Sequence, residues 1–434
     1  MMYYKTLKNI RTKFNISAEK LAEITGYDVE YIRNLEGPNS EEQASQEFVD
    51  TLKEKLDLKG APITESEIES LQNRLYNWKI MIDYGFLDKA VKWKPILEQD
   101  VNRSFSSSTK YYMDLYTASF FWAVGNYESC YQLLDSLSQK TDQFNSRHFY
   151  MYYRLVGMRA LTENRLKDAV TAFSKAERMD RHLRQNEVGL YYLYGKCLSD
   201  LGYVGRAVDN LKKAKRLSIW GKLYEGQPNK RYDVYIDGCL AYNLSITGQS
   251  DKALNILNKR LQAVERTNAG ERALGYTYFS LGSVFLEARK YSEAISNFNI
   301  AFQYLDPGEE TYKVALFCKA VSLIRDGMIT EAVDYAETGL DLCLDDDEDE
   351  LWRAKFEIIK HLAALDNPDS VAYLESSIIP ILAKYEYHYV IVEYYEALCN
   401  YYEQNGDLAQ ALKYSKSSAN AFRTLYEERI KRGL

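Results

Sequence analysis

From Leu71 to the C-terminus, small residues, glycines and aromatic residues recur with helical spacing in a pattern that repeats about every forty residues. The clearest copy is GYTYFSLGSVFLEARKYSEAISNFNIAFQYLDPGEE, which carries Gly282 in its first half and Ala294, Phe298 and Ala301 in its second. Small residues allow two antiparallel helices to cross closely, and aromatic side chains fill the space beside them. The pattern therefore predicts an all-α array of stacked helix pairs.

This spacing is typical of the tetratricopeptide repeat, a helix-turn-helix unit that buries its apolar face only against a neighbouring unit. Matching the template along the chain predicts about nine pairs in a right-handed superhelical solenoid over residues 61–434. A weak eighth copy spans Leu351–Ala383, and the segment 215–233 predicts an extended helix followed by a loop. The other copies are marked by Gly85, Gly125, Gly157, Gly202, Gly248, Gly327 and Gly406.

The first sixty residues have a separate pattern, in which short helices are divided by helix-starting and helix-ending residues. Ser17 and Asp28 are expected to cap a second and a third helix, and Gly26 is expected to end the second. The inward positions are expected to be Leu7, Ile10 and Phe14, then Leu21 and Ala22, then Ile32 and Leu35.

This N-terminal segment resembles the helix-turn-helix of the Cro and lambda-repressor-like (Xre) family. The resemblance implies that the third helix enters the DNA major groove with Val29, Glu30, Arg33 and Asn34, because Arg can pair with guanine and Asn with adenine. It also implies phosphate contacts from Lys5, Lys8, Arg11 and Lys20. Ala18 stands where the family usually has Gln, and Glu30 is acidic, so a helical module that does not bind DNA is the alternative.

An Xre-like head followed by a long tetratricopeptide array resembles the RRNPP family of peptide-sensing regulators, and its length is most like the NprR branch. The resemblance implies a cytoplasmic quorum-sensing transcription regulator that forms a homodimer, binds double-stranded DNA and is switched by a short signalling peptide in the concave repeat groove. Two alternatives are a Rap-like module that binds a response regulator and a repeat scaffold without a small ligand.

The groove of such an array is formed mainly by first-helix residues three and four apart, away from the small residues at the helix crossings. Asn side chains suit a peptide backbone, and Arg154, Lys196 or Arg325 could pair with a peptide carboxylate or acidic side chain. Packing between repeats is the competing interpretation for the tyrosines. The expected peptide-binding residues are Arg154, Met158, Tyr192, Lys196, Tyr235, Tyr242, Asn243, Tyr276, Phe279, Phe317 and Asn400.

Composition supports a globular helical protein. The 434 residues are 46% hydrophobic and 27% charged, with a formal net charge of −7 and only seven prolines. The opening MMYYKTLKNIR is not followed by a long apolar run, so no signal peptide or membrane span is expected.

Known catalytic and metal-binding spacings do not occur in the sequence. The six cysteines are scattered without a C-x-x-C pair, and there is no Gly-rich phosphate loop and no metal-ligand spacing among the four histidines. We therefore expect reduced thiols, no cofactor, no metal and no enzyme activity. The acidic run 345–350 lacks the central Gly of an EF-hand and is expected to form a solvated turn before a helix.

Overall fold

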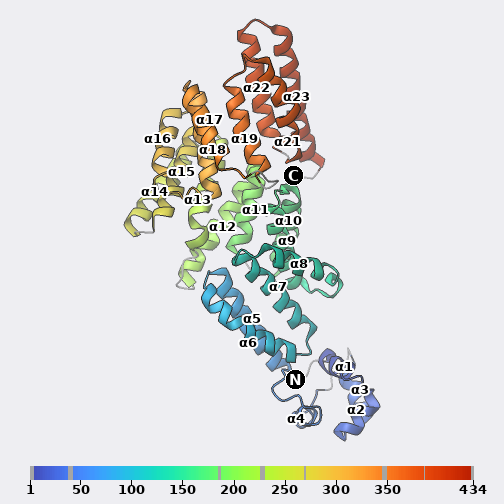
Figure 1. The fold of residues 1–434 in the computed structure, drawn as a ribbon. Helices are drawn as coiled ribbons and strands as arrows, with labels where there is room; N and C mark the ends of the chain where they lie inside the picture. The colour runs from blue at the N-terminus through green and yellow to red at the C-terminus, as the bar shows by residue number, and fades with distance from the viewer. Residues whose placement is uncertain are drawn as a thin grey trace. The chain divides into compact units, whose positions relative to one another are not determined.

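The structure is a computed structural model that describes residues 4–37, 43–183, 187–224, 230–267, 270–344, 349–385 and 387–431. Within these residues every regular element is helical and no strand occurs (Figure 1). The prediction of an all-α fold is confirmed.

Four short helices form the head. They are α1 (Tyr4–Lys13), α2 (Ala18–Thr25), α3 (Val29–Leu35) and α4 (Gln46–Lys55).

Nine helix pairs follow in the described part of the chain, as the repeat pattern predicts. They are α5 (Glu65–Asp83) with α6 (Leu87–Arg103), α7 (Ser107–Ala123) with α8 (Tyr127–Ser138), α9 (Ser146–Thr162) with α10 (Leu166–Leu183), α11 (Val188–Asp200) with α12 (Val204–Tyr224), α13 (Lys230–Ile246) with α14 (Ser250–Thr267), α15 (Glu271–Glu287) with α16 (Tyr291–Ala301), α17 (Glu310–Arg325) with α18 (Ile329–Asp341), α19 (Glu350–Leu362) with the segment from α20 (Pro368–Tyr373) to α21 (Ile379–Lys384), and α22 (His388–Gln404) with α23 (Leu408–Lys431).

The chain divides into two compact units. Unit 1 comprises Met1–Arg159 and Lys175–Gln185, and unit 2 comprises Ala160–Ser174 and Asn186–Leu434. The head therefore shares unit 1 with the first helix pairs, whereas the pairs from α11 onward belong to unit 2.

The head is built by local capping, as expected. The Ser17 hydroxyl accepts a hydrogen bond from the Lys20 N–H, and the Asp28 carboxylate accepts one from the Glu30 N–H. Gly26 ends α2 with φ 75°, in the left-handed region.

Two features of the head differ from the prediction. The core includes α4, which contributes the fully buried Phe48 and Leu52 and was not expected from the sequence. Phe14 was expected to face inward and is instead 41% exposed, because α1 ends at Lys13 and Asn15 turns the chain at φ 51°.

In the repeat array of unit 2, each first helix from α11 to α17 contacts the next first helix, and each second helix from α12 to α18 contacts the first helix that follows it. Helices α11, α13, α15, α17 and α19 contact one another in series, and each packs on the second helix of its own pair. Glycine permits these close crossings: a Cβ on Gly282 would lie 2.7 Å from the Phe298 ring, and one on Gly195 would lie 2.8 Å from Leu211. Ala294, Phe298 and Ala301 are fully buried, as the clearest copy predicts.

The eighth copy is irregular, as its weak match to the template indicates. Its second helix is interrupted between α20 and α21 by a π-helical turn, Leu374–Ile378, which ends two residues before Pro380. Proline lacks the N–H that continues an α-helix, and a π turn accommodates the missing bond.

Two further segments were expected from the sequence. The long α12 confirms the extended helix after Ala214, while the loop expected beyond it falls on residues 225–229, outside the described residues. Of the acidic run, Asp345 to Glu348 also lie outside them. Asp349, one of the final acids expected at the start of the next helix, is the N-cap residue of α19; it is buried, and its carboxylate accepts hydrogen bonds from Lys313 Nζ at 2.8 and 2.9 Å.

Candidate functional site

The exposed face of α3 carries three of the four residues expected to meet DNA bases. Glu30, Arg33 and Asn34 are exposed, whereas Val29 is half-buried against the head core. Arg33 forms an ion pair with Glu19 of α2. The backbone N–H of Glu19, the Ser17 hydroxyl and the Arg33 guanidinium together lower the pKa of Glu19 to about 2.

The basic residues expected to contact phosphates have different surroundings. Lys8 and Lys20 are exposed, and Lys20 Nζ lies 2.8 Å from Glu23. Lys5 belongs to α1, but its side chain is outside the described residues. Arg11 is half-buried: its guanidinium donates two 2.9 Å hydrogen bonds to Glu36 and one to the Ile16 carbonyl, so it joins α1 to the end of α3.

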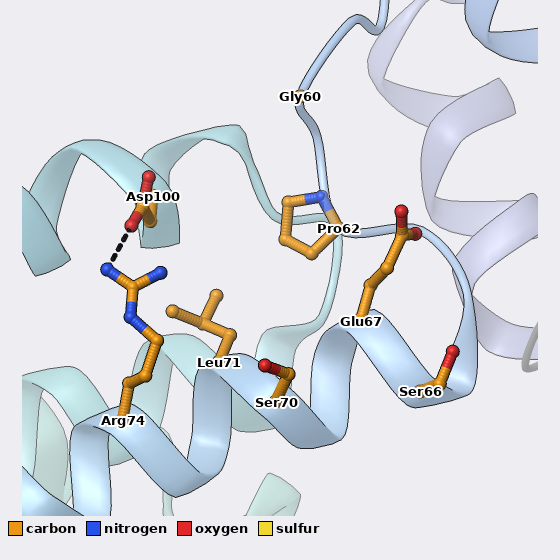
Figure 2. A pocket seen from close by; sticks show the side chains of 8 residues that line it. All are labelled: Gly60, Pro62, Ser66, Glu67, Ser70, Leu71, Arg74 and Asp100. Carbon is orange, nitrogen blue, oxygen red and sulfur yellow. Dashed lines mark ion pairs between the residues drawn. The ribbon is translucent and has the colours of Figure 1, made fainter.

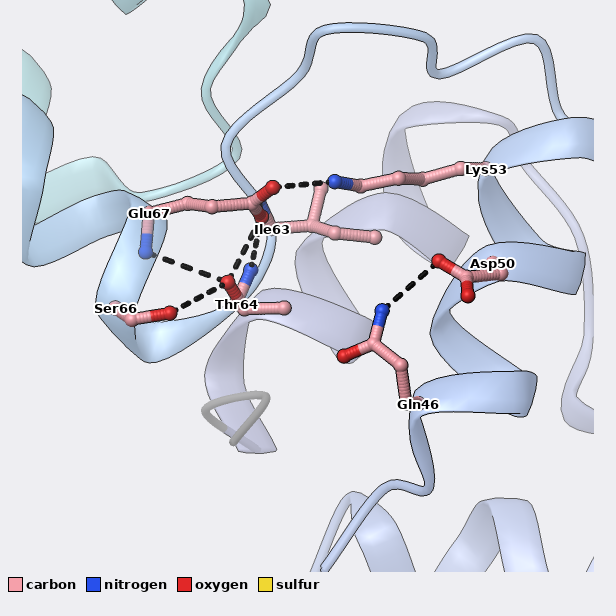
Figure 3. A network of polar contacts seen from close by, with 7 residues as sticks. All are labelled: Gln46, Asp50, Lys53, Ile63, Thr64, Ser66 and Glu67. Carbon is pink, nitrogen blue, oxygen red and sulfur yellow. Dashed lines mark hydrogen bonds and ion pairs between the residues drawn. The ribbon is translucent and has the colours of Figure 1, made fainter.

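A polar network connects the head to the first helix pair (Figure 3). Thr64 and Glu67 form a reciprocal capping box at the start of α5, and Lys53 of α4 donates a 2.5 Å hydrogen bond to Glu67. Burial opposes ionisation of Glu67, but the hydrogen bonds from Lys53, Thr64 and Ile63 outweigh it and lower the pKa to about 2. A charge-assisted contact thus ties the last head helix to the repeat array.

A small pocket opens beside this network (Figure 2). Its lining is mostly polar and includes Arg74, whose guanidinium lies 2.7 Å from Asp100. Because its one cationic group already has a carboxylate partner, this pocket is a weak candidate for an acidic ligand. The lining residues are Gly60, Pro62, Ser66, Glu67, Ser70, Leu71, Arg74 and Asp100.

In unit 2, three of the tyrosines expected to bind peptide form a row across three first helices. The ring centroids of Tyr192 and Tyr235 are 6.2 Å apart, and those of Tyr235 and Tyr276 are 4.5 Å apart and edge-on. The Tyr276 hydroxyl donates to Glu309 at 3.0 Å. Burial raises the pKa of Tyr192 and of Tyr235, so both remain neutral hydrogen-bonding phenols.

A charged cluster adjoins this row. Lys196 Nζ on α11 lies 2.9 Å from Asp200 one turn later, and the Asp200 charge, aided by Glu310 on α17, holds the pKa of Lys196 well above its usual value. Lys355 on α19 interacts electrostatically with Asp200, Glu310 and Lys196. The first helices of copies far apart in the sequence therefore bring their side chains together inside unit 2.

Asn243 lies at the contact between α11 and α13 and is fully buried. Its amide donates to the Ser199 hydroxyl and to the Cys239 carbonyl, both at 2.8 Å, while its Oδ1 has no hydrogen-bond partner among the described residues. A buried acceptor without a donor is costly in the free protein. It could accept a hydrogen bond from a bound ligand.

The remaining expected residues have other surroundings. Arg154 and Met158 belong to unit 1, where Arg154 is buried 3.8 Å from Asp83. Phe279 packs on Phe298, and Phe317 packs edge-on to Phe356, so both belong to hydrophobic cores. Tyr242 is half-buried on α13, and Asn400 is exposed on α22.

Sequence reasoning missed Lys355 and Glu310. Lys355 had a recognisable signal, because it lies four residues after Leu351 and four before Ile359 on the apolar face of α19. A lone lysine on such a face is unusual, but the poor repeat match of this copy obscured it.

Comparison with known proteins adds three relatives, and no protein-family model matches the chain. The transcriptional activator NprA of Geobacillus stearothermophilus is 20% identical over 405 residues, which are 90% of this chain and 96% of that protein. A Rap protein complexed with competence and sporulation factor superposes with a TM-score of 0.71 at 16% identity, covering 83% of this chain and all of the other. NprR in complex with its cognate peptide NprX gives a TM-score of 0.66 at 17% identity, covering 81% and 99%.

The structural likenesses confirm the tetratricopeptide-type solenoid. Among the described residues, no helix is both long enough and apolar enough to cross a membrane. Together the comparisons confirm the resemblance of this chain to the RRNPP family of regulators and to its NprR branch.

Proposed function

We propose that this chain is a cytoplasmic transcription regulator whose DNA binding is switched by a short signalling peptide. The observation that carries the proposal is the capped α2–α3 pair, which leaves Arg33 and Asn34 exposed on one helix. The name of the curated relative and the peptide complexes of two structural neighbours support both halves of the proposal.

In the proposed DNA complex, α3 lies in the major groove. Arg33 exchanges its contact with Glu19 for a guanine, and Asn34 pairs with adenine. Lys5, Lys8 and Lys20 contact phosphates. Arg11 serves mainly to hold Glu36, and thereby the end of α3, in position.

The proposed peptide site lies around the tyrosine row of unit 2. Tyr192, Tyr235 and Tyr276 offer aromatic surface and hydroxyls, and Asn243 offers its unsatisfied acceptor. Tyr242 and Asn400 stay in the proposal as further contacts within unit 2. Arg154 and Met158 stay proposed as separate peptide contacts of unit 1. Phe279 and Phe317 support the site through the cores they pack in.

The DNA half can be tested by fluorescence anisotropy with DNA from upstream of the protein's own gene. Arg33→Ala combined with Asn34→Ala should weaken binding by about tenfold or more, since each base contact contributes on the order of 1–3 kcal/mol. The matched control is Lys212→Ala with Arg216→Ala, two exposed residues of α12, which should bind DNA like the unmodified protein.

Three other results would count against this half of the proposal. The first is no DNA binding at any salt concentration, and the second is equal DNA binding by the unmodified protein and the α3 variant. The third is that the protein captures a response regulator but does not bind DNA. The last would favour the Rap-like alternative. A homodimer is proposed for a two-fold DNA site, and light scattering would measure it.

A further inference from the structure

Three described lysines are buried, and they differ in what their ammonium groups contact. Lys79 Nζ lies 2.5 Å from the carboxylate of Asp83, and Lys319 Nζ lies 2.5 Å from the Asn299 side-chain oxygen. Lys355 is also buried, at 8% exposure, yet among the described residues its Nζ has no hydrogen-bond acceptor and no ion-pair partner. An ammonium group has three N–H donors, and leaving them all unsatisfied in a buried place is costly.

The surroundings of Lys355 attract a cation but do not accept the hydrogen bonds of its ammonium group. Its Nζ lies 4.2 Å from the centroid of the Trp352 ring and 4.2 Å from that of Tyr387. Two aromatic faces attract a cation but accept no strong hydrogen bond from it. Burial lowers the pKa of Lys355 to about 8, against the raising influence of Asp200 and Glu310, so the group still carries a proton at pH 7.

Neighbouring charges indicate which anion would fit. Lys196 is already paired with Asp200 at 2.9 Å, whereas Glu310 acts on Lys355 from beyond ion-pair distance, so the Lys355 ammonium has no anion bonded to it among the described residues. Asp200 and Glu310 would repel a doubly charged group such as a phosphate more strongly than a single carboxylate. A singly charged carboxylate satisfies Lys355 with the least repulsion.

We propose that Lys355 binds a carboxylate of the signalling peptide, either its C-terminus or an Asp or Glu side chain, between the rings of Trp352 and Tyr387. The inference rests on the proposed peptide-binding function and specifies its ligand as a peptide with an accessible carboxylate. The tyrosine row and Asn243 would then contact the rest of the peptide.

Two matched variants separate binding from folding. Lys355→Met removes a buried cation without a partner and should leave the thermal midpoint of the peptide-free protein unchanged or raise it, because apolar replacement of a buried charge is often neutral or stabilising. Lys319→Met removes a buried cation that has a partner and should lower the midpoint while leaving peptide binding intact.

The probes are three pools of short linear peptides with randomised central positions, presented to the full-length protein. One pool has a free C-terminal carboxylate and no acidic side chain, one is amidated and contains a single Asp, and one is amidated with Asn in place of Asp. Captured peptides are identified by mass spectrometry, and their affinities are measured by calorimetry.

We expect capture from one or both carboxylate pools, and affinity for those peptides about tenfold or more weaker in Lys355→Met, as expected for loss of a charge-assisted hydrogen bond. The pool that yields the peptides distinguishes a terminal from a side-chain carboxylate. Equal capture from the amidated Asn pool, or unchanged affinity in Lys355→Met, would overturn the inference while peptide binding stands. Capture from none of the pools would overturn both.

Discussion

At the scale of single residues, the buried imidazole of His148 should give the fold a defined response to acid. His148 is 1% exposed, its Nδ1 accepts a hydrogen bond from the Asn145 N–H, and its Nε2 lies 3.4 Å from the Ser108 hydroxyl. Burial, reinforced by the charge of Arg147, lowers the pKa of His148 to about 4.

The sign of the pH effect follows from proton uptake. Between about pH 6.5 and pH 4 the unfolded chain carries a proton on His148 that the folded chain does not, so acidification through this window favours unfolding. We expect the thermal midpoint to fall more steeply over this range in the unmodified protein than in His148→Gln. The exposed His182→Gln should follow the unmodified protein. Parallel curves for all three proteins would contradict the assignment.

A second residue-scale prediction concerns the helix–helix turns. Most copies place glycine at positive φ there, for example Gly248 at 75° and Gly327 at 83°, but the sixth copy has Arg289 at 59°. A non-glycine side chain in this region destabilises the fold by roughly 1–2 kcal/mol. Replacing it with glycine removes this strain, but glycine loses more conformational entropy on folding, which offsets part of the stabilisation. Arg289→Gly should therefore raise the free energy of unfolding by about 0.5–1 kcal/mol, measured by urea denaturation. Gly327→Ala should lower it, and a shift of both variants in one direction would refute the explanation.

At the scale of elements, two helical glycines distinguish close packing from helix propensity. A Cβ on Gly282 would strike the fully buried Phe298 ring, whereas one on Gly205 would meet no atom within 4 Å. Gly282→Ala should lower the free energy of unfolding by about 1–3 kcal/mol through overpacking. Gly205→Ala should raise it by up to about 1 kcal/mol. Urea denaturation of both variants measures the two changes in the free energy of unfolding. Equal changes would contradict the close helix crossing at Gly282.

The elements that the sequence predicted well are those governed by local rules. The caps at Ser17 and Asp28, the turn at Gly26 and the number of helix pairs depend on residues within one or two turns of each other. Helix α4 was missed, because its apolar residues complete a core formed by distant segments.

The candidate site was predicted only in part, for the same physical reason. Tyr192, Tyr235 and Tyr276 occupy equivalent positions of consecutive copies, so the repeat period places them together. The interaction of Lys355 with Asp200 depends on the curvature accumulated over several copies, which the period of a single repeat does not specify. Phe279 and Phe317 share the same spacing as the tyrosines but pack into cores.

At the scale of the whole molecule, a regulator needs its ligand to favour one DNA-binding state over another. The contact between Lys53 and Glu67 joins the head to the first repeat pair, so the head need not behave as an independent module. Coupling between two sites in one protein typically changes affinity by about 5- to 150-fold.

The most direct test of the central claim is the affinity of the full-length protein for its own upstream DNA, with and without a peptide shown by thermal shift to bind it. Anisotropy titrations at one fixed salt concentration would give both values, because DNA affinity depends strongly on salt. The bound peptide should change DNA affinity at least about fivefold, in either direction, and the Arg33→Ala, Asn34→Ala variant should keep the peptide affinity while losing DNA binding. Equal DNA affinity with and without a saturating peptide would contradict that claim.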